Sequence, residues 1–290
     1  MIILKPRSQD NHARTASIVL EKKKIGLVGA GMMAEAIIRG LQKAGVNPSR
    51  ISASDPDDKR RDFFKQELGI AAVVENSSVV QSADVIILAV KPYIIPETLA
   101  EIGGMLKPNQ LLISIAAGVT IDSIENKLSG NIPVIRAMPN TPCLIGEGAT
   151  AIAPGKYTTS THMEIASQIF NAIGKVVQIS EDKLDAVTGL SGSGPAYVYT
   201  FIEALADGGV RVGLPRATAL LLAAQTVVGA AKMVMETGEQ PAELRDRVMT
   251  PGGTTVAGMA SLERSDFRSA TIEAVVAATN RSAELGKTNK

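Results

Sequence analysis

Short runs of branched apolar residues alternate with amphipathic segments from Lys24 onward. Runs such as Ile25–Val28 and Val85–Val90 contain almost no polar side chains, which is typical of strands buried on both faces of a parallel sheet. Further strands are predicted at residues 51–54, 72–74, 111–115, 132–137, 149–153 and 175–179. Helices are predicted between most of them, at residues 32–41, 57–68, 96–105, 121–128 and 163–172. This alternation predicts an α/β domain with helices on both sides of a parallel sheet.

The strand pattern stops near Lys183, and the rest of the chain is predicted to be helical. The predicted helices span residues 195–207, 215–236, 241–248, 255–264 and 267–285. Pro215 fits the first turn of a helix, and Gly208 with Gly209 fits the end of the preceding one. We therefore expect an α/β domain over residues 23–183 and an all-α domain over residues 184–290. Residues 1–22 lack periodicity and are expected to form an irregular or disordered extension.

The segment 217–235 is apolar on nearly every side and approaches the length of a membrane span. Gln225, Thr226 and Lys232 interrupt it, and small residues are more frequent in it than large ones. A helix that is apolar all round is otherwise buried. We therefore expect a subunit interface here and no membrane association.

Composition narrows the possible functions. The 290 residues carry a net charge of +1, which gives no footprint for nucleic acid or for an anionic membrane. The single cysteine, Cys143, excludes an internal disulfide and fits a cytoplasmic location. His12 and His162 are far apart and have no cysteine beside them, so we expect neither a metal site nor a histidine-centred triad.

Gly29, Ala30 and Gly31 begin a G-x-G-x-x-A motif between the first predicted strand and helix. In a Rossmann-type domain the first glycine permits a tight turn, and the second lets backbone amides approach a pyrophosphate. The motif alone is also compatible with an ordinary glycine-rich turn. Asp55, which ends the second predicted strand, supplies the acidic residue expected in this context and favours dinucleotide binding.

Two more predicted strand ends should face the same crevice, because ligands bind beyond the carboxyl ends of parallel strands. They are Ala89–Pro92 and Ala116–Gly118, whose small residues leave room for a nicotinamide ring. Lys91 fits a contact with cofactor charge as well as it fits a solvated strand-end lysine.

Five segments together resemble the pyrroline-5-carboxylate reductase family. They are Ala89-Val90-Lys91-Pro92, Met138-Pro139-Asn140-Thr141-Pro142, Asp185–Tyr197, Ala206–Val210 and Thr250-Pro251-Gly252-Gly253-Thr254-Thr255. The resemblance runs from about Lys24 to the C-terminus. It implies an oxidoreductase of proline biosynthesis that reduces 1-pyrroline-5-carboxylate to L-proline with NADP(H) or NAD(H). It also implies a homodimer formed through the helical domain, often within larger rings.

The resemblance also implies site residues. For the cofactor they are Ala30, Met32, Met33, Asn76, Val90, Lys91 and Ala117, beside Gly29, Gly31, Asp55 and Pro92 from the motifs. For the substrate they are Glu181, Gly252, Gly253, Thr254 and Thr255. Where relatives commonly carry a small polar residue near the 2′-phosphate, this chain has Asp55, so both cofactors are expected.

Residues 250–255 run into a predicted helix, and the amides of a glycine turn at a helix N-terminus can bind a carboxylate. The Thr255 hydroxyl can exchange a hydrogen bond with the ring nitrogen of a cyclic imine. On residue types alone, a plain turn with a threonine N-cap fits equally well. With the resemblance, Thr255 becomes the candidate catalytic residue.

Two other functions fit parts of the sequence. A β-hydroxyacid dehydrogenase also joins a Rossmann-type domain to helices, but its catalytic lysine has no counterpart between Lys183 and Lys232. A non-catalytic dinucleotide-sensing module would bind nucleotide without turnover and would leave the 250–255 loop without a purpose.

Overall fold

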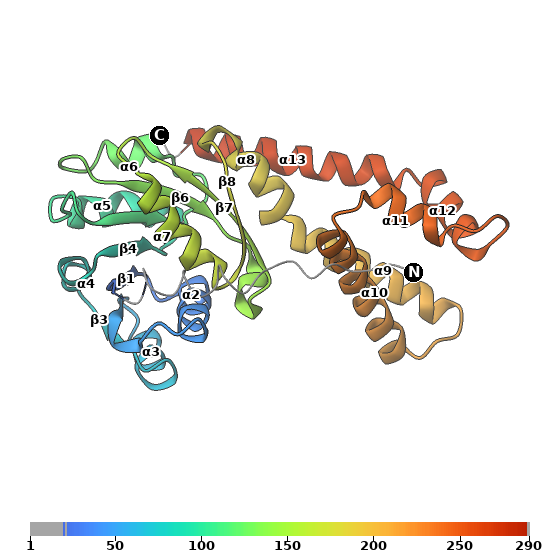
Figure 1. Cartoon of the computed structure of the whole chain (residues 1–290), viewed down its shortest axis with the longest axis horizontal. Helices are drawn as coiled ribbons and strands as arrows, with labels where there is room; N and C mark the ends of the chain where they lie inside the picture. Colours follow the sequence, from blue (N-terminus) through green and yellow to red (C-terminus); the bar gives the residue numbers. More distant parts are fainter. Residues whose placement is uncertain (1–19, 21, 289–290) are drawn as a thin grey trace. The chain divides into compact units, whose positions relative to one another are not determined.

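The computed structural model describes residue 20 and residues 22–288 (Figure 1). Packing divides them into two compact units. The sheet unit comprises the described residues up to 193 together with 277–288, and the helical unit comprises residues 194–276. The N-terminal extension expected at residues 1–22 lies outside the described residues, apart from Leu20 and Lys22.

The sheet unit contains one eight-stranded sheet in the order β3-β2-β1-β4-β5-β6-β7-β8. The first six positions have the strand order of a Rossmann fold, which confirms the predicted fold class. The strands are β1 (Ile25–Val28), β2 (Ile51–Ser54), β3 (Ala71–Val73), β4 (Val85–Leu88), β5 (Leu111–Ser114), β6 (Val134–Met138), β7 (Gly148–Pro154) and β8 (Gly174–Gln178).

The sheet is not entirely parallel, because β7 runs antiparallel to β6. The segment between Met138 and Gly148 holds only the short helix η3 (Thr141–Ile145). A parallel connection requires a crossover of about a dozen residues or more, so this segment can only turn the chain back. Strand β8 then pairs parallel to β7.

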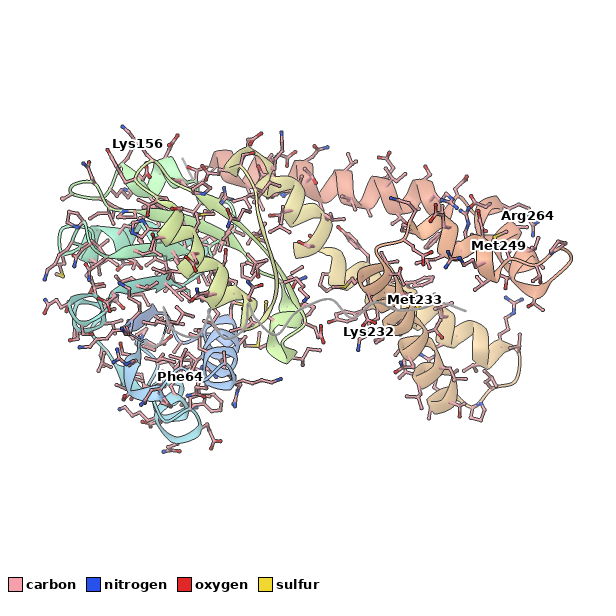
Figure 2. The ribbon with its side chains drawn as sticks, viewed as in Figure 1. Phe64, Lys156, Lys232, Met233, Met249 and Arg264 are labelled. Carbon is pink, nitrogen blue, oxygen red and sulfur yellow. The ribbon has the colours of Figure 1, made fainter. Side chains whose placement is uncertain are left out.

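Apolar side chains from both faces of the sheet are covered by helices. One face packs against α2 (Met32–Lys43), α3 (Asp58–Glu67) and α7 (Ser160–Asn171), and Phe64 of α3, labelled in Figure 2, is fully buried there. The opposite face packs against α4 (Asn76–Ser82), α5 (Ile95–Ile102) and α6 (Ile121–Glu125). Shorter helices are η1 (Pro48–Arg50), η2 (Pro92–Ile94), η4 (Glu181–Lys183), α8 (Leu184–Val187) and the π-helix η5 (Thr188–Gly192).

The helical unit begins with α9 (Gly194–Arg211) and α10 (Arg216–Thr237), followed by α11 (Pro241–Val248) and α12 (Thr254–Arg264). The last helix, α13 (Phe267–Thr288), begins in this unit, and its C-terminal part belongs to the sheet unit. There, the buried Ser282 hydroxyl donates to Asp185 Oδ1 over 2.7 Å. Among the described residues no strand follows β8. The boundary that we expect between the α/β domain and the all-α domain, at residues 183 and 184, stays a prediction.

Gly208 and Gly209 do not end a helix, contrary to our expectation, because α9 continues through them to Arg211. The reason is packing between helices. A Cβ on Gly209 would lie 3.0 Å from the Cβ of Ala219 in α10, so this glycine allows the two helices to approach closely. Gly213 follows the end of α9 with φ of +103°, a left-handed conformation that glycine adopts without strain.

Helix α10 is long and apolar enough to cross a membrane, and only 11% of its most apolar window is buried in the single chain. Lys232 and Met233, labelled in Figure 2, project from this helix, and Met233 is 42% exposed. Leu220, Leu221 and Leu222 are exposed as well. By length and composition, α10 fits a membrane span as well as it fits an interface helix.

Gly40 in α2 offers a test of how closely the helices of the sheet unit pack. A Cβ at this position would lie 2.2 Å from Ile173 Cγ2 and 2.7 Å from the carbonyl oxygen of Ala172. We expect Gly40→Ala to lower the free energy of unfolding by about 1–3 kcal/mol, because overpacking outweighs the better helix propensity of alanine. Lys43→Ala, at an exposed position of the same helix, should change it by less than about 0.5 kcal/mol. Urea denaturation measures both, and a Gly40→Ala protein as stable as wild type would contradict the close contact.

Candidate active site

A cavity of about 970 Å³ lies at the carboxyl ends of β1, β2, β4, β5 and β6. This is where a doubly wound sheet binds a dinucleotide. Every predicted cofactor residue except Ala30 lines it: Gly29, Gly31, Met32, Met33, Asp55, Asn76, Val90, Lys91, Pro92 and Ala117. The structure thus brings together residues that are up to 88 positions apart in the sequence.

The glycine turn between β1 and α2 has the geometry that a pyrophosphate needs. Gly29 has φ of +101°, and a Cβ there would lie 2.8 Å from the carbonyl oxygen of Ala89. Gly31 is the N-cap of α2, where no side chain caps the helix, and a Cβ at Gly31 would meet nothing within 4 Å. The positive end of α2 is therefore open to an anion.

Asp55 is fixed by two backbone amides. Its Oδ2 accepts a hydrogen bond from the N–H of Ala30 over 2.7 Å, and its Oδ1 accepts one from the N–H of Asp57 over 2.9 Å. Ala30 is fully buried, which explains why it does not line the cavity. Each carboxylate oxygen retains a second lone pair, so Asp55 can still accept hydrogen bonds from a ribose.

Arg60 and Arg61 of α3 are both bound to backbone carbonyl oxygens near Asp55. Arg60 donates from Nε to the carbonyl oxygen of Ala30 over 2.7 Å and pairs with Glu35. Arg61 donates from Nη1 to the carbonyl oxygens of Asp55 and Pro56, each over 2.8 Å. Both guanidinium groups therefore brace the turns around Asp55, and either would have to break these bonds to reach a phosphate.

Asn76 is held in one orientation. Its Oδ1 accepts a hydrogen bond from the buried Ser54 hydroxyl over 2.7 Å, and its Nδ2 donates to Glu101 Oε2 over 2.7 Å.

The carboxylates that line the cavity are those of Asp55, Glu75, Glu97 and Glu101, whereas Lys91 is the single basic side chain among its lining residues. The charged side chains that line the cavity are therefore mostly acidic.

One carboxylate oxygen of Glu181, the predicted substrate contact in the sheet unit, is used for hydrogen bonds within the fold. Its Oε1 accepts hydrogen bonds from the N–H of Ile121, over 2.6 Å, and from Arg136 Nη1, over 3.1 Å. Arg136 is only 5% exposed. Sequence reasoning missed this arginine, although a charged residue inside the apolar run 132–137 signals a buried ion pair.

The other predicted substrate residues, Gly252–Thr255, belong to the helical unit. Gly252 has φ of +69°, and Gly253 is the N-cap of α12 without any side-chain cap. A threonine N-cap is therefore wrong as an explanation of this loop. The first amides of α12 lack a side-chain partner, and the Thr255 side chain is half-buried beside them.

Other reactive residue types have structural roles. Cys143 is buried, and burial raises the pKa of its thiol above the usual value, so it stays protonated. His162 forms a capping box with Thr159 at the start of α7. In the part of the chain that the structure describes, no group of three or more His, Cys, Asp or Glu side chains is placed to hold a metal ion.

Two protein families match separate parts of the chain. Residues 181–285 match pyrroline-5-carboxylate reductase dimerisation, and residues 24–118 match NADP oxidoreductase, coenzyme F420-dependent. The first match covers the predicted helical domain as far as residue 285, and the second covers β1 through β5 with the glycine turn.

Similar proteins match the chain over nearly its whole length. A pyrroline-5-carboxylate reductase from Methanosarcina acetivorans is 46% identical over 92% of this chain and 100% of its own length. A solved structure of such a reductase from Coxiella burnetii is 38% identical, has a TM-score of 0.87, and covers 91% of this chain and 98% of that one. The pyrroline carboxylate reductase of Plasmodium falciparum, solved with NADP bound, is 34% identical with a TM-score of 0.82, over 92% and 99%. On this similarity, which spans both the dinucleotide cavity and the helices, the chain belongs to the pyrroline-5-carboxylate reductase family.

Proposed function

We propose that this protein reduces 1-pyrroline-5-carboxylate to L-proline with a hydride from NAD(P)H, the last step of proline biosynthesis. The observation that carries the proposal is the match of residues 181–285 to the dimerisation domain of this reductase family, downstream of a complete dinucleotide cavity. A Rossmann-type cavity by itself fits many reductases. The β-hydroxyacid dehydrogenase alternative loses support, because the helical half belongs to a different family.

NAD(P)H supplies the hydride, and the chain supplies binding and orientation. The open N-terminus of α2 and the glycine turn would hold the pyrophosphate, and Asp55 would hold the adenosine ribose. Ala116 and Ala117, at the end of β5, are small and would leave room in the cavity for the nicotinamide ring. No metal or histidine is required, since a protonated imine already carries the charge that draws the hydride.

The substrate carboxylate would bind to the uncapped amides of α12 at Gly252–Thr255. The Thr255 hydroxyl, one residue into this helix, would orient the ring nitrogen. Glu181, in the sheet unit, is the other residue that we propose for substrate binding; its Oε1 is bound to Arg136. Most of the rate gain then comes from positioning and from exclusion of water.

The exposed apolar face of α9 and α10 supports a homodimer formed through the helical domain. Isolated monomers rarely expose an apolar patch of this extent, and the matching family domain is a dimerisation domain. We place α10 in that interface and not in a membrane, and we assign the protein to the cytoplasm as a dimer or a ring of dimers.

The direct test is proline formation. Purified protein should oxidise NADH and NADPH in the presence of pyrroline-5-carboxylate, with the loss of absorbance at 340 nm matched by proline measured independently. A nucleotide-sensing module would bind NADH without forming proline. A protein that binds either cofactor and makes no proline would refute the proposed reaction.

Cofactor choice tests Asp55. The 2′-phosphate of NADPH would add up to two negative charges beside the Asp55 carboxylate, and this repulsion costs about 1 kcal/mol or more. We expect both cofactors to be used, with NADH favoured more than in relatives that lack the acid. Asp55→Ser keeps an oxygen for the Ala30 amide and should shift the ratio of kcat/KM toward NADPH about tenfold, corresponding to roughly 1.4 kcal/mol.

Asp62→Ser is the matched control for that experiment. It removes the same charge from an exposed position on α3 that does not line the cavity. The ratio of kcat/KM for the two cofactors should then stay within about twofold of wild type, because screening weakens distant charges. An unchanged ratio in Asp55→Ser would mean that Asp55 does not face the ribose.

Thr255 can be tested without changing its shape. Thr255→Val removes the hydroxyl and should lower kcat/KM for pyrroline-5-carboxylate by roughly ten- to a hundredfold, the effect of one positioned hydrogen bond of about 1–3 kcal/mol. Cofactor affinity should hardly change. Thr158→Val removes a hydroxyl bonded to the Val134 carbonyl, away from the cavity, and should leave kcat/KM unchanged. Equal activities of Thr255→Val and wild type would exclude Thr255 from the active site.

A further inference from the structure

The side chain of Asn140 joins two segments of the sheet unit that are far apart in sequence. Its Nδ2 donates to the carbonyl oxygen of Ser191 over 3.0 Å, and its Oδ1 accepts from the N–H of Ala149 over 2.9 Å. The residue is 9% exposed. Both ends of the amide are thus used, which fixes its orientation and ties η5 to the start of β7.

The neighbours of Asn140 in the sequence form part of the cavity. Met138, Pro139 and Thr141 line it, at the end of β6 and the start of η3. We call these three residues the β6 wall. A dinucleotide lies across the crevice of a Rossmann sheet. With Asp55 at the adenosine side beyond β2, the β6 wall belongs to the opposite, nicotinamide side.

The segment on the other side of Asn140 is a π-helix, η5, which separates the predicted substrate residue Glu181 from α9. The N–H of Ser193 donates to the carbonyl oxygen of Thr188 over 2.8 Å, the spacing of a π-turn. Single π-turns are rare and frequently occur at functional sites. Four positions after Ser191 stands Pro195, which has no N–H, so the Ser191 carbonyl oxygen lacks the usual helical donor and accepts from Asn140 instead.

A second contact joins the same two segments. A Cβ on Gly192 would lie 2.9 Å from Cε of Met138, so the π-turn packs directly against the β6 wall. The Asn140 hydrogen bond and the Gly192 contact therefore act on the same part of the cavity. A shift of η5 would move the β6 wall with it.

We propose that Asn140 is a positioning residue for hydride transfer: by locking the π-turn to the β6 wall, it sets the shape of the nicotinamide side of the cavity. The inference rests on the proposed reductase function and adds a residue that does not itself line the cavity. Small displacements of a reacting group are costly, since an error of about 1 Å can lower the rate about a hundredfold.

Asn140→Asp tests this role with nearly no change of shape. The carboxylate keeps an oxygen for the Ala149 amide but places another against the Ser191 carbonyl, where a donor is needed. We expect kcat to fall roughly ten- to a hundredfold, while the dissociation constant for NADH changes less than about threefold. With NADH deuterated at the transferred position, the isotope effect on kcat should rise, because hydride transfer becomes rate-limiting.

Gln110→Glu is the matched control. Gln110 is 4% exposed, and its Nε2 donates to the carbonyl oxygens of Val80 and Ala83, over 2.8 and 2.7 Å, outside the cavity. The same amide-to-acid change should lower the melting temperature but leave kcat and the isotope effect of the folded enzyme as in wild type. A purely structural role for Asn140 would make the two variants behave alike.

Gly192→Ala probes the same coupling from the other side and keeps the inference testable if Asn140→Asp does not fold. The added methyl group would lie closest to the flexible end of Met138, at 2.9 Å from Cε, and at ordinary contact distances of 3.6 and 3.8 Å from Thr188, so the fold should persist while the β6 wall shifts. We expect a smaller decrease of kcat, about three- to tenfold, with the same rise in isotope effect.

The outcomes separate the two proposals. An active wild type, together with folded Asn140 or Gly192 variants whose kcat and isotope effects match wild type, would overturn the positioning role alone. The same result would follow if Gln110→Glu reproduced the Asn140→Asp kinetics. A wild type that forms no proline would overturn the reductase function and this inference with it.

Discussion

The close approach of the Gly29 turn to the end of β4 is the constraint on which the cavity depends. The Gly29 N–H donates to the Ser54 carbonyl oxygen, and Asp55 and Arg60 bind the N–H and the carbonyl oxygen of Ala30. The peptide groups between β1 and α2 are thereby fixed from β2 and α3. Because this backbone is fixed, the N-terminus of α2 is presented without a side chain over it.

The same bonds underlie the cofactor preference that we propose. The whole chain has a net charge of only +1. Near Asp55, however, the basic and the acidic side chains are not equally free to meet a ligand. Arg60 and Arg61 are occupied by carbonyl oxygens and carboxylates, whereas four acidic side chains line the cavity. Whether a 2′-phosphate is attracted or repelled therefore depends on which charged side chains face the cavity, and not on how many basic residues the sequence contains.

The sequence predicted the strands and most helices because burial on both faces of a sheet imposes a clear apolar pattern. Features set by tertiary contacts were not predictable in this way. Helix α4 was missed because its short polar sequence carries little periodicity, and the π-turn at Thr188–Gly192 has no distinct residue pattern. Gly208 and Gly209 signalled a helix end, whereas the contact between Gly209 and Ala219 is a requirement of helix packing. Likewise, the motif around Asn140 was visible, but its partner Ser191 lies 51 positions away.

Glu181 shows why a proposed substrate contact can be harder to test than a cofactor contact. Its carboxylate pairs with a buried arginine and also accepts from the first amide of α6, so it stabilises the fold in addition to the substrate role that we propose for it. Removing one partner of a buried ion pair leaves an uncompensated charge and costs about 3–5 kcal/mol. Loss of activity on changing Glu181 alone therefore combines both effects. Thr255 lies on α12 and takes no part in this ion pair, so we expect loss of its hydroxyl to separate binding from stability far better.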